Sequence, residues 1–204
     1  MSQSPVKVAP HPAPHPDGLS MLDKRRIEAE ILKEVYETLK ASHGEAVARQ
    51  TVSESVRRSA IEQARTFAAS VPGGTSLKSF QDIQHLWTKG GSLEIEVKEQ
   101  GEQSFTFNVV RCRYAETYKA MGLGEIGHLL SCNRDELFIV GYNPDIELTR
   151  TQTIMGGASH CDFTVAEQVE AFEAMVMWER DGIKPSGDDV VTPATVAATT
   201  YGCT

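Results

Sequence analysis

The sequence contains no apolar run that approaches the ~20 residues needed to cross a bilayer, and its first residues, MSQSPVKVAPHPAPHPDG, lack the apolar core of a secretory signal. It also lacks an excess of positive charge. The net charge of −8 and the pI near 5.3 disfavour nucleic acids and anionic membranes as partners. We therefore expect a cytoplasmic protein, in which the four cysteines are reduced thiols rather than disulfides.

The 204 residues suffice for one domain with a sizeable core, and no internal repeat is evident. Residues 1–18 alternate proline with histidine, alanine and serine, which predicts a disordered arm. Residues 19–182 form the predicted domain, with a helical part over 19–90 and the site in an α+β part over 91–182. Residues 183–204 form a tail of weak periodicity. The predicted fold class is α+β: N-terminal helices followed by a small antiparallel sheet with inserted helices.

Two long amphipathic helices are predicted in the helical part. Ser20 and Asp23 resemble a capping arrangement before the first helix, which ends near Gly44. The second ends at 72–74 (Pro-Gly-Gly), and a shorter helix follows over 77–87. Their apolar stripes predict either core packing or the interface of a homo-oligomer. The stripe positions are Ile27, Ile31, Leu32, Val35 and Leu39 in the first helix and Val47, Val52, Val56, Ala60, Ala64, Phe67 and Val71 in the second.

After residue 91 the hydrophobic period changes from 3.6 to 2. Alternation over 93–97 and 105–109 predicts a β-hairpin. A Gly156-Gly157 turn is predicted between two later strands. The remaining predicted elements are helices over 111–122, 124–133 and 166–181, a turn at VGYNPD (140–145), and the two strands over 146–155 and 160–165.

Three of the four cysteines lie between residues 112 and 161, and each has titratable neighbours at a useful spacing. Cys112 and Glu116 are four residues apart where a strand passes into a helix. His128 and Cys132 have the same spacing on the next helix, so they share a face. Asp135 follows three residues later in CNRD. This clustering indicates a site more strongly than any one of its members.

The stretch GGASHCDF places a histidine, a cysteine and an aspartate side by side. Side chains alternate along a strand, so His160 and Asp162 should point together and away from Cys161. The three neighbours are then not a local triad. A base for Cys161 has to come from elsewhere, with His128, Glu116 and Asp135 as candidates.

The cluster allows four interpretations. A thiol nucleophile needs a pKa lowered by a cation, a helix N-terminus or a nearby base. Zinc would be held by the three cysteines and a histidine, although no C-x₂₋₄-C pair is present and the ligands would converge from separate elements. The thiols also suit a non-catalytic protein that binds a soft metal or a thiol ligand, or they are simply small buried hydrophobes.

Several short motifs in order make the chain similar to a known family. RCRYAE, CNRD, GYNPD, TRTQT and CDF follow one another over residues 108–165. In this order they resemble the signature region of the L-2-amino-thiazoline-4-carboxylic acid hydrolases. The resemblance implies cleavage of a carbon–nitrogen bond in a small cyclic amidine or amide, in which a thiazoline ring opens to an N-carbamoyl amino acid. It implies a small heterocyclic substrate and no cofactor, with zinc as the alternative.

The residues carried over by these motifs are Cys112, Glu116, Cys132, Asp135, Arg150, Cys161 and Asp162. For a thiol mechanism we assign Cys161 as the nucleophile, with Cys132 as its main competitor. Asp135 and Glu116 would hold the amidine nitrogens or transfer protons, assisted by His128 or His160. Arg150 would bind a substrate carboxylate in a bidentate manner, or lie on a solvated face.

Overall fold

The structure is a computed structural model that describes residues 18–167, 180 and 182. The chain divides into two units, Met1–Glu167 and Gln168–Thr204, and the first contains all the elements described below. The predicted arm over 1–18, the helix over 166–181 and the tail over 183–204 fall almost wholly outside the described residues. In the described part of the chain, no helix combines the length and the apolar character that a membrane span requires.

The α+β prediction is confirmed. Helices α1 and α2 come first and are joined at Gly44, whose φ is +86°. The predicted cap of α1 is present, because Ser20 Oγ accepts a hydrogen bond from Asp23 N at 3.1 Å. The elements, in order, are α1 (Met21–His43), α2 (Glu45–Ala69), α3 (Leu77–Ile83), α4 (His85–Thr88), η1 (Lys89–Gly91), β1 (Leu93–Gln100), β2 (Ser104–Cys112), α5 (Arg113–Ala120), the π-helix η2 (His128–Cys132), α6 (Asn133–Tyr142), β3 (Ile146–Thr149) and β4 (Cys161–Glu167).

The strands form one antiparallel sheet in the order β1-β2-β4-β3. The predicted hairpin is present as β1 and β2, with Val97 opposite Phe107. Strand β4 lies on the other side of β2, and its register places Cys161 opposite Val109 and Phe163 opposite Phe107. These inward-facing residues therefore line up across the two central strands.

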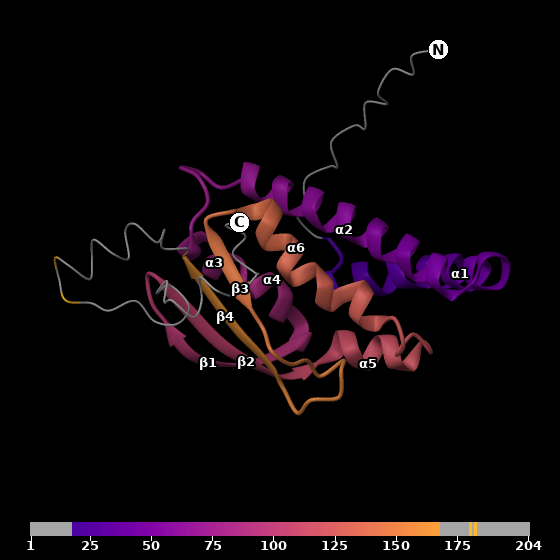
Figure 1. Ribbon diagram of the computed structural model, residues 1–204. Helices are drawn as coiled ribbons and strands as arrows, with labels where there is room; N and C mark the ends of the chain where they lie inside the picture. The colour runs from indigo at the N-terminus through magenta and orange to yellow at the C-terminus, as the bar shows by residue number, and fades with distance from the viewer. Residues whose placement is uncertain (1–17, 168–179, 181, 183–204) are drawn as a thin grey trace, which may run out of the picture. The chain divides into compact units, whose positions relative to one another are not determined.

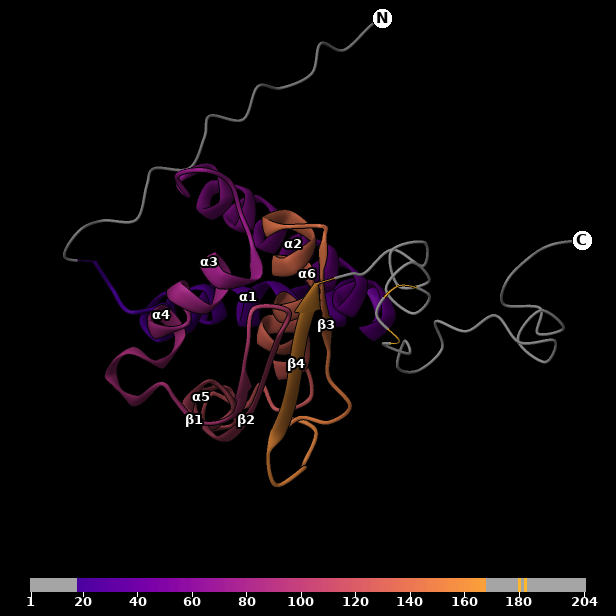
Figure 2. The ribbon, with the colours of Figure 1, turned by 90° about the vertical axis from the view of Figure 1, so that its left-hand side faces the viewer.

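Helices cover one face of this sheet. Figures 1 and 2 show α2 and α6 on that face and α5 at the end where β2 finishes. A first core joins the sheet to α2, α3 and α6. A second core joins α1, α2, α5 and η2, and includes Tyr36, Val56, Tyr118 and Ile126. The two cores meet at Trp87, Leu93 and Cys112, which pack against both.

Helices α2 and α6 approach closely at Gly141. A Cβ atom at this position would lie 2.5 Å from Ile61 O and 2.8 Å from Ala64 Cβ, so only glycine fits. The helix nevertheless continues to Tyr142, because Phe138, Ile139 and Tyr142 are buried at helical spacing. The predicted turn over 140–145 is thus wrong for its first half: the chain turns only at 143–145, where Asn143 Oδ1 accepts from Asp145 N at 2.8 Å.

The stripe predicted for the first helix is core only in part: Leu32 and Leu39 pack against the second core, and the other three residues are exposed. Ile27, Ile31 and Val35 are 42%, 67% and 38% exposed, and α1 instead buries Met21, Arg25, Ala29 and Tyr36. Self-association through this exposed stripe stays a prediction. The α2 stripe is buried as expected at Val52, Val56, Ala60 and Ala64, whereas Val47 is exposed.

Three further boundaries differ from the sequence expectation. The strand predicted over 146–155 ends at Thr149, because the next backbone groups bond elsewhere. Thr151 N and Gln152 N donate to the Asp162 carboxylate, and Ile154 N donates to Cys161 Sγ. The helix predicted over 124–133 is the π-helix η2, which runs into α6. Residues 166–167 belong to β4 rather than to a helix.

Candidate active site

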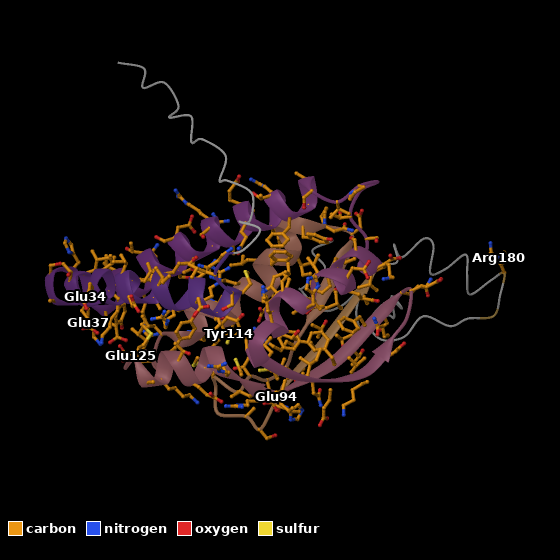
Figure 3. The ribbon with its side chains drawn as sticks, turned by 180° about the vertical axis from the view of Figure 1, so that it is seen from behind. Glu34, Glu37, Glu94, Tyr114, Glu125 and Arg180 are labelled. Carbon is orange, nitrogen blue, oxygen red and sulfur yellow. The ribbon has the colours of Figure 1, made fainter. Side chains whose placement is uncertain are left out.

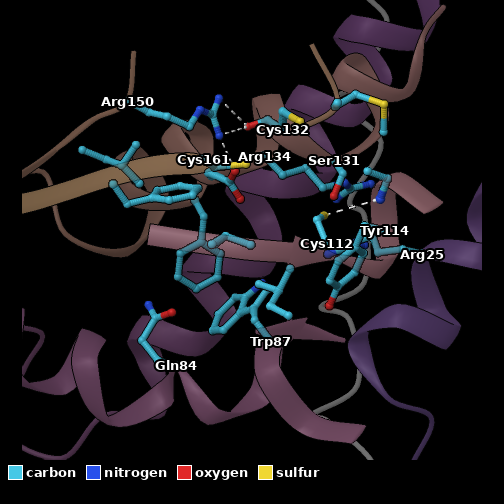
Figure 4. Close-up of a pocket in the computed structure, with 18 of the residues that line it drawn as sticks. Arg25, Gln84, Trp87, Cys112, Tyr114, Ser131, Cys132, Arg134, Arg150 and Cys161 are labelled. Carbon is cyan, nitrogen blue, oxygen red and sulfur yellow. Dashed lines mark hydrogen bonds and ion pairs between the residues drawn. The ribbon is translucent and has the colours of Figure 1, made fainter. Parts of the chain in front are cut away.

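One cavity lies where the two cores meet. Its volume is about 110 Å³, which on the same measure exceeds the space of a single water several-fold and suits a small ring. Helices α1, α2 and α4, the start of α5, the η2–α6 region and strands β2 and β4 all contribute to it. Its ionisable and thiol residues are Arg25, Cys112, Tyr114, Cys132, Arg134, Asp135, Arg150 and Cys161 (Figure 4).

The structure brings Cys112, Cys132 and Cys161 to this cavity from three different elements. Cys112 is the N-cap of α5, and its Sγ accepts from Ala115 N at 3.4 Å. Cys161 begins β4, and its Sγ accepts from Ile154 N at 3.2 Å. Backbone N–H groups thus point at two of the three thiols, as a thiolate would require.

Cys132 reaches the cavity through an unusual helix. Residues His128–Cys132 form a π-helix that continues directly into α6. A π-helical turn widens the backbone and changes the direction of the side chains that follow, and such turns are frequent at functional sites. Here the widened turn places Ser131 and Cys132 on the cavity wall, and Arg134 and Asp135 follow on the first turn of α6.

Burial favours the neutral, protonated form of all three thiols. Burial raises the pKa of Cys112 to about 11 and that of Cys132 to about 12. Burial also raises the pKa of Cys161, although the bond from Ile154 N opposes this change. The negative charge of Asp135 adds to the increase at each thiol. Nucleophilic attack by any of them therefore requires a base that takes the S–H proton.

Asp135 has the properties of such a base. Burial raises its pKa to about 6, even though Arg150 partly offsets this effect by its charge and hydrogen bond. Arg150 Nη1 donates to Asp135 Oδ2 at 2.5 Å, and both Arg150 Nη atoms donate to Cys132 O at 3.2 Å. The guanidinium also lies 5.3 Å from the Phe163 ring centroid. Arg150 is thus fixed by the protein, with its side chain only 8% exposed.

A second group of charges comes from α1 and α6. Arg25 Nη1 donates to both carboxylate oxygens of Glu28 at 2.7 Å, and its Nη2 donates to Gln63 Oε1. Arg134 Nη2 donates to the same carboxylate at 3.0 Å, and its Nε donates to Leu130 O at 2.9 Å. The arginine side chains are 7% and 9% exposed. Two buried cations therefore share one carboxylate.

Two buried polar atoms of the described residues have no hydrogen-bond partner, and both belong to cavity residues: Tyr114 Oη and Arg134 Nη1. Tyr114 is 5% exposed and lies in the interior, whereas Glu94 lies on the outside of the sheet (Figure 3). Burial raises the pKa of Tyr114 and lowers that of Arg134 to about 10. Buried donors are almost always paired in folded proteins, so these two mark a place where a ligand's polar atoms would be satisfied.

The rest of the wall is apolar and aromatic. Phe107 and Phe163 stack with ring centroids 4.9 Å apart, and Trp87 meets Phe138 edge-on at 5.1 Å. Leu93, Val109 and Leu148 complete this side. An apolar wall excludes water and strengthens the interactions of the few polar groups that face it.

Two of the predicted catalytic residues lie away from the cavity. Glu116 is half-exposed and forms an ion pair with Arg111, whose Nε donates to it at 2.8 Å; this bond lowers the Glu116 pKa. His128 is exposed, and partial burial and the charge of Arg49 lower its pKa. Neither residue is on the cavity wall. The four-residue spacing that suggested both is a local relation, and the helices turn these side chains outward.

Asp162 lies on the face of β4 opposite Cys161, as the alternation predicts, whereas His160 lies just before the strand begins. His160 interacts with Gln152 Nε2 at 2.8 Å and with Ser159 Oγ at 3.0 Å. Asp162 accepts from Thr151 N at 3.1 Å and from Gln152 N at 2.8 Å. Asp162 therefore holds the segment after β3, the segment that begins with Arg150, rather than facing the cavity.

The zinc alternative has no ready donor set in the described part of the chain. Within residues 18–167 no three histidine, cysteine, aspartate or glutamate side chains are arranged to hold a metal ion. Sequence reasoning missed Arg25, Tyr114 and Arg134. Arg134 and Tyr114 do lie inside the motifs CNRD and RCRY, but a motif letter does not reveal that its side chain is buried without a partner. Arg25 lies outside every motif.

Fold and cavity together define a small α+β protein with a cavity that three cysteine thiols line. The profile of the L-2-amino-thiazoline-4-carboxylic acid hydrolases matches residues 24–165. This match spans more than half of the chain, and the chain belongs to that family. The family is one of hydrolases, as its name states.

Other comparisons add little. None of the curated proteins matches the chain. Among solved structures, the phenol-responsive sensory domain of the transcription activator PoxR is 14% identical, with a TM-score of 0.42, over 74% of this chain and 79% of that one. A trafficking protein particle complex subunit 3 from Naegleria fowleri, covalently bound to palmitic acid, is 8% identical, with a TM-score of 0.43, over 72% and 96% of the two chains.

Proposed function

We propose that the protein opens the ring of a small cyclic amidine such as 2-amino-thiazoline-4-carboxylate, by attack of a cysteine thiol. The observation that carries this proposal is the convergence of Cys161, Cys132, Asp135 and Arg150 on one cavity inside the region that matches the family. A related cyclic amide is the alternative substrate. A zinc hydrolase with the same thiols is a weaker candidate because of the donor geometry described above.

Cys161 is the best nucleophile among the three thiols. Cys161 pairs with Val109 of β2 at the end of the β2–β4 ladder, so the sheet fixes its backbone. The N–H of Ile154 already points at the Cys161 sulfur and favours its thiolate. Cys132 is the main competitor, because it lies closer in sequence to Asp135 on the same helical segment.

The proposed reaction has three steps. Asp135 takes the thiol proton while Cys161 Sγ bonds to the ring carbon that carries both nitrogens. The tetrahedral adduct expels the ring sulfur, which takes the proton back from Asp135. Water then adds to the same carbon and releases Cys161 as a thiol. The product is an N-carbamoyl amino acid with a free thiol.

The fate of the two nitrogens decides which ring bond is broken. An N-carbamoyl product keeps both nitrogens on the attacked carbon, so a thiazoline must lose its ring carbon–sulfur bond. Only a cyclic amide or an all-nitrogen ring would lose the carbon–nitrogen bond expected from the sequence. A thiol reagent distinguishes the two outcomes, because only the first releases a new thiol.

The test is ring opening of 2-amino-thiazoline-4-carboxylate, followed by mass spectrometry in ¹⁸O-water. We expect one ¹⁸O atom in the product and loss of roughly 10²-fold or more in kcat/KM for Cys161→Ser. A covalent adduct with the mass of protein plus substrate should appear on Cys161. Full activity of both Cys161→Ser and Cys132→Ser would remove these thiols from the mechanism.

Matched controls come from the residues that the structure places outside the cavity. Glu116→Gln and His128→Ala should retain kcat/KM within a few-fold, because neither side chain reaches the cavity wall. A large loss in either variant would show that the site extends beyond this cavity.

A further inference from the structure

Two of the three guanidinium groups at the cavity share one carboxylate, whereas the third, Arg150, forms ion pairs with Asp135 and, at 3.8 Å, with Glu136. The two that share a carboxylate are those of Arg25 and Arg134, which have only Glu28 between them. Removing a charge from water without a counter-charge is costly, so this pair is suited to a negative group from outside the protein.

The hydrogen bonds show which of the two cations is incomplete. Arg25 donates from Nη1 to Glu28 and from Nη2 to Gln63. Arg134 uses Nε on Leu130 O and Nη2 on Glu28, and its Nη1 has no partner although the residue is 93% buried (7% exposed). Arg134 is one of the residues that line the cavity, and an unpartnered guanidinium N–H is a donor for an anionic oxygen.

Arg150, the carboxylate ligand expected from the sequence, is unsuited to that role. Both of its Nη atoms already donate to protein groups, to Asp135 and to the Cys132 carbonyl. It lies on the opposite side of the cavity from Arg25 and Tyr114 in Figure 4. Withdrawing it to bind substrate would leave Asp135 without its cation.

We infer that Arg134, with Arg25 beside it, binds the carboxylate of the substrate and so makes the site specific for ring compounds that bear a carboxylate. This inference rests on the proposed function for the identity of the ring. The carboxylate would complete the two-arginine, one-carboxylate group formed with Glu28. Arg134 then acts as a specificity-determining residue, while the ring faces the thiols on the same cavity wall.

The test measures binding, so that it does not depend on turnover. Isothermal titration at pH 7.5 compares 2-aminothiazole-4-carboxylate with 2-aminothiazole, two aromatic and unreactive ring analogues that differ only in the carboxylate. We expect the wild-type protein to bind the carboxylate roughly 10- to 100-fold more tightly, the range for hydrogen bonds to a charged group. In Arg134→Met this preference should fall to near one.

Two control variants sharpen the result. Arg58→Met removes a guanidinium whose side chain is 76% exposed on α2, and it should keep the full preference. Arg150→Met should lose much less of it than Arg134→Met, because Arg150 already donates to Asp135 and to the Cys132 carbonyl. A preference lost in Arg150→Met but kept in Arg134→Met would overturn the inference, as would equal binding of both analogues by the wild-type protein.

Glu28→Gln provides a second variant if Arg134→Met does not fold. It removes the carboxylate that competes for the two arginines, so the preference for the carboxylate analogue should increase. An unchanged or smaller preference in Glu28→Gln would contradict the inference. A carboxylate preference without ring opening would refute the proposed function alone, and ring opening that ignores the carboxylate would refute this inference alone.

Discussion

Replacing Asp135 by asparagine should change activity and stability in opposite directions. The Asp135 pKa is raised to about 6 by burial, against the opposing effect of Arg150. As the proposed base, Asp135 must be ionised to take the thiol proton, so kcat/KM of the wild-type protein should rise with pH through about 6. Asparagine cannot take a proton, and Asp135→Asn should lose roughly 10²- to 10⁴-fold in kcat/KM at pH 7.5.

Stability follows the opposite course. Between pH 3.8, the ordinary pKa, and about 6, the folded state binds the Asp135 proton more tightly than the unfolded state does. The free energy of unfolding therefore falls as pH rises through this window. The full difference corresponds to about 3 kcal/mol at 1.36 kcal/mol per pH unit. A third of the Asp135 side chain is exposed, where it lines the cavity, and solvent screening reduces this contribution to about 1 to 2 kcal/mol.

Asparagine has the shape of the protonated acid and can still accept a hydrogen bond from Arg150. The free energy of unfolding of Asp135→Asn should then be about 1 to 2 kcal/mol higher than that of the wild-type protein at pH 8. The two free energies should coincide near pH 4. Urea unfolding at both pH values, together with a pH–rate profile, checks this. A variant that is less stable than wild type at pH 8, or a wild-type profile without an inflection near 6, would refute the reasoning.

Two further predictions concern packing and the segment beside the site. Gly141→Ala should lower the free energy of unfolding by about 1 to 3 kcal/mol, because its Cβ would lie 2.5 Å from Ile61 O. The control is Gly124→Ala, whose Cβ would meet its nearest atom at 3.8 Å. In the same urea assay its free energy of unfolding should stay within about 0.5 kcal/mol of the wild-type value. Asp162→Asn should destabilise by about 1 kcal/mol at pH 7. Burial opposes ionisation of Asp162, but hydrogen bonds from Thr151 and from neighbouring backbone N–H groups outweigh burial and lower the Asp162 pKa. The stability difference between Asp162→Asn and the wild-type protein should therefore vanish as pH falls through that pKa. A stability difference that stays constant down to pH 2 would contradict this prediction.

The fold was predictable where the hydrophobic pattern has one interpretation. The period-2 alternation over 93–97 and 105–109 predicted the hairpin, because charged or polar residues alternate with apolar ones on a half-exposed sheet. Helix α6 was not foreseen as an element. Its sequence NRDELFIVGY has a glycine as its last residue but one and is followed by the turn-like NPD, yet the helix extends past Gly141 because Phe138, Ile139 and Tyr142 are buried against neighbouring elements. Tertiary contact sets the C-terminal boundary of α6, and local helix propensity carries no information about that contact.

The site was predictable in its thiols and less so in its charges. Ordered spacing indicated that Cys112, Cys132, Cys161 and Asp135 belong together, and the structure brings them to one cavity. Their chemical roles stay predictions. Which arginine lacks a partner depends on hydrogen bonds between elements far apart in sequence, such as the one from Arg134 to Glu28 across 106 positions. Spacing within a motif carries no information about such a bond.

The helical part of the chain contributes to the site that the sequence located in residues 91–182. Arg25, Gln63 and Trp87 all lie on the cavity wall and come from the segment 19–90, and the family match itself begins at residue 24. Glu28, also on α1, fixes both Arg25 and Arg134. The α1 face that lacks a sequence motif therefore sets the charge of the cavity. Residues 19–90 supply Arg25 and the Glu28 carboxylate that Arg25 shares with Arg134, whereas the later part of the chain supplies Arg134, the thiols and Asp135, so both parts contribute to the cavity wall.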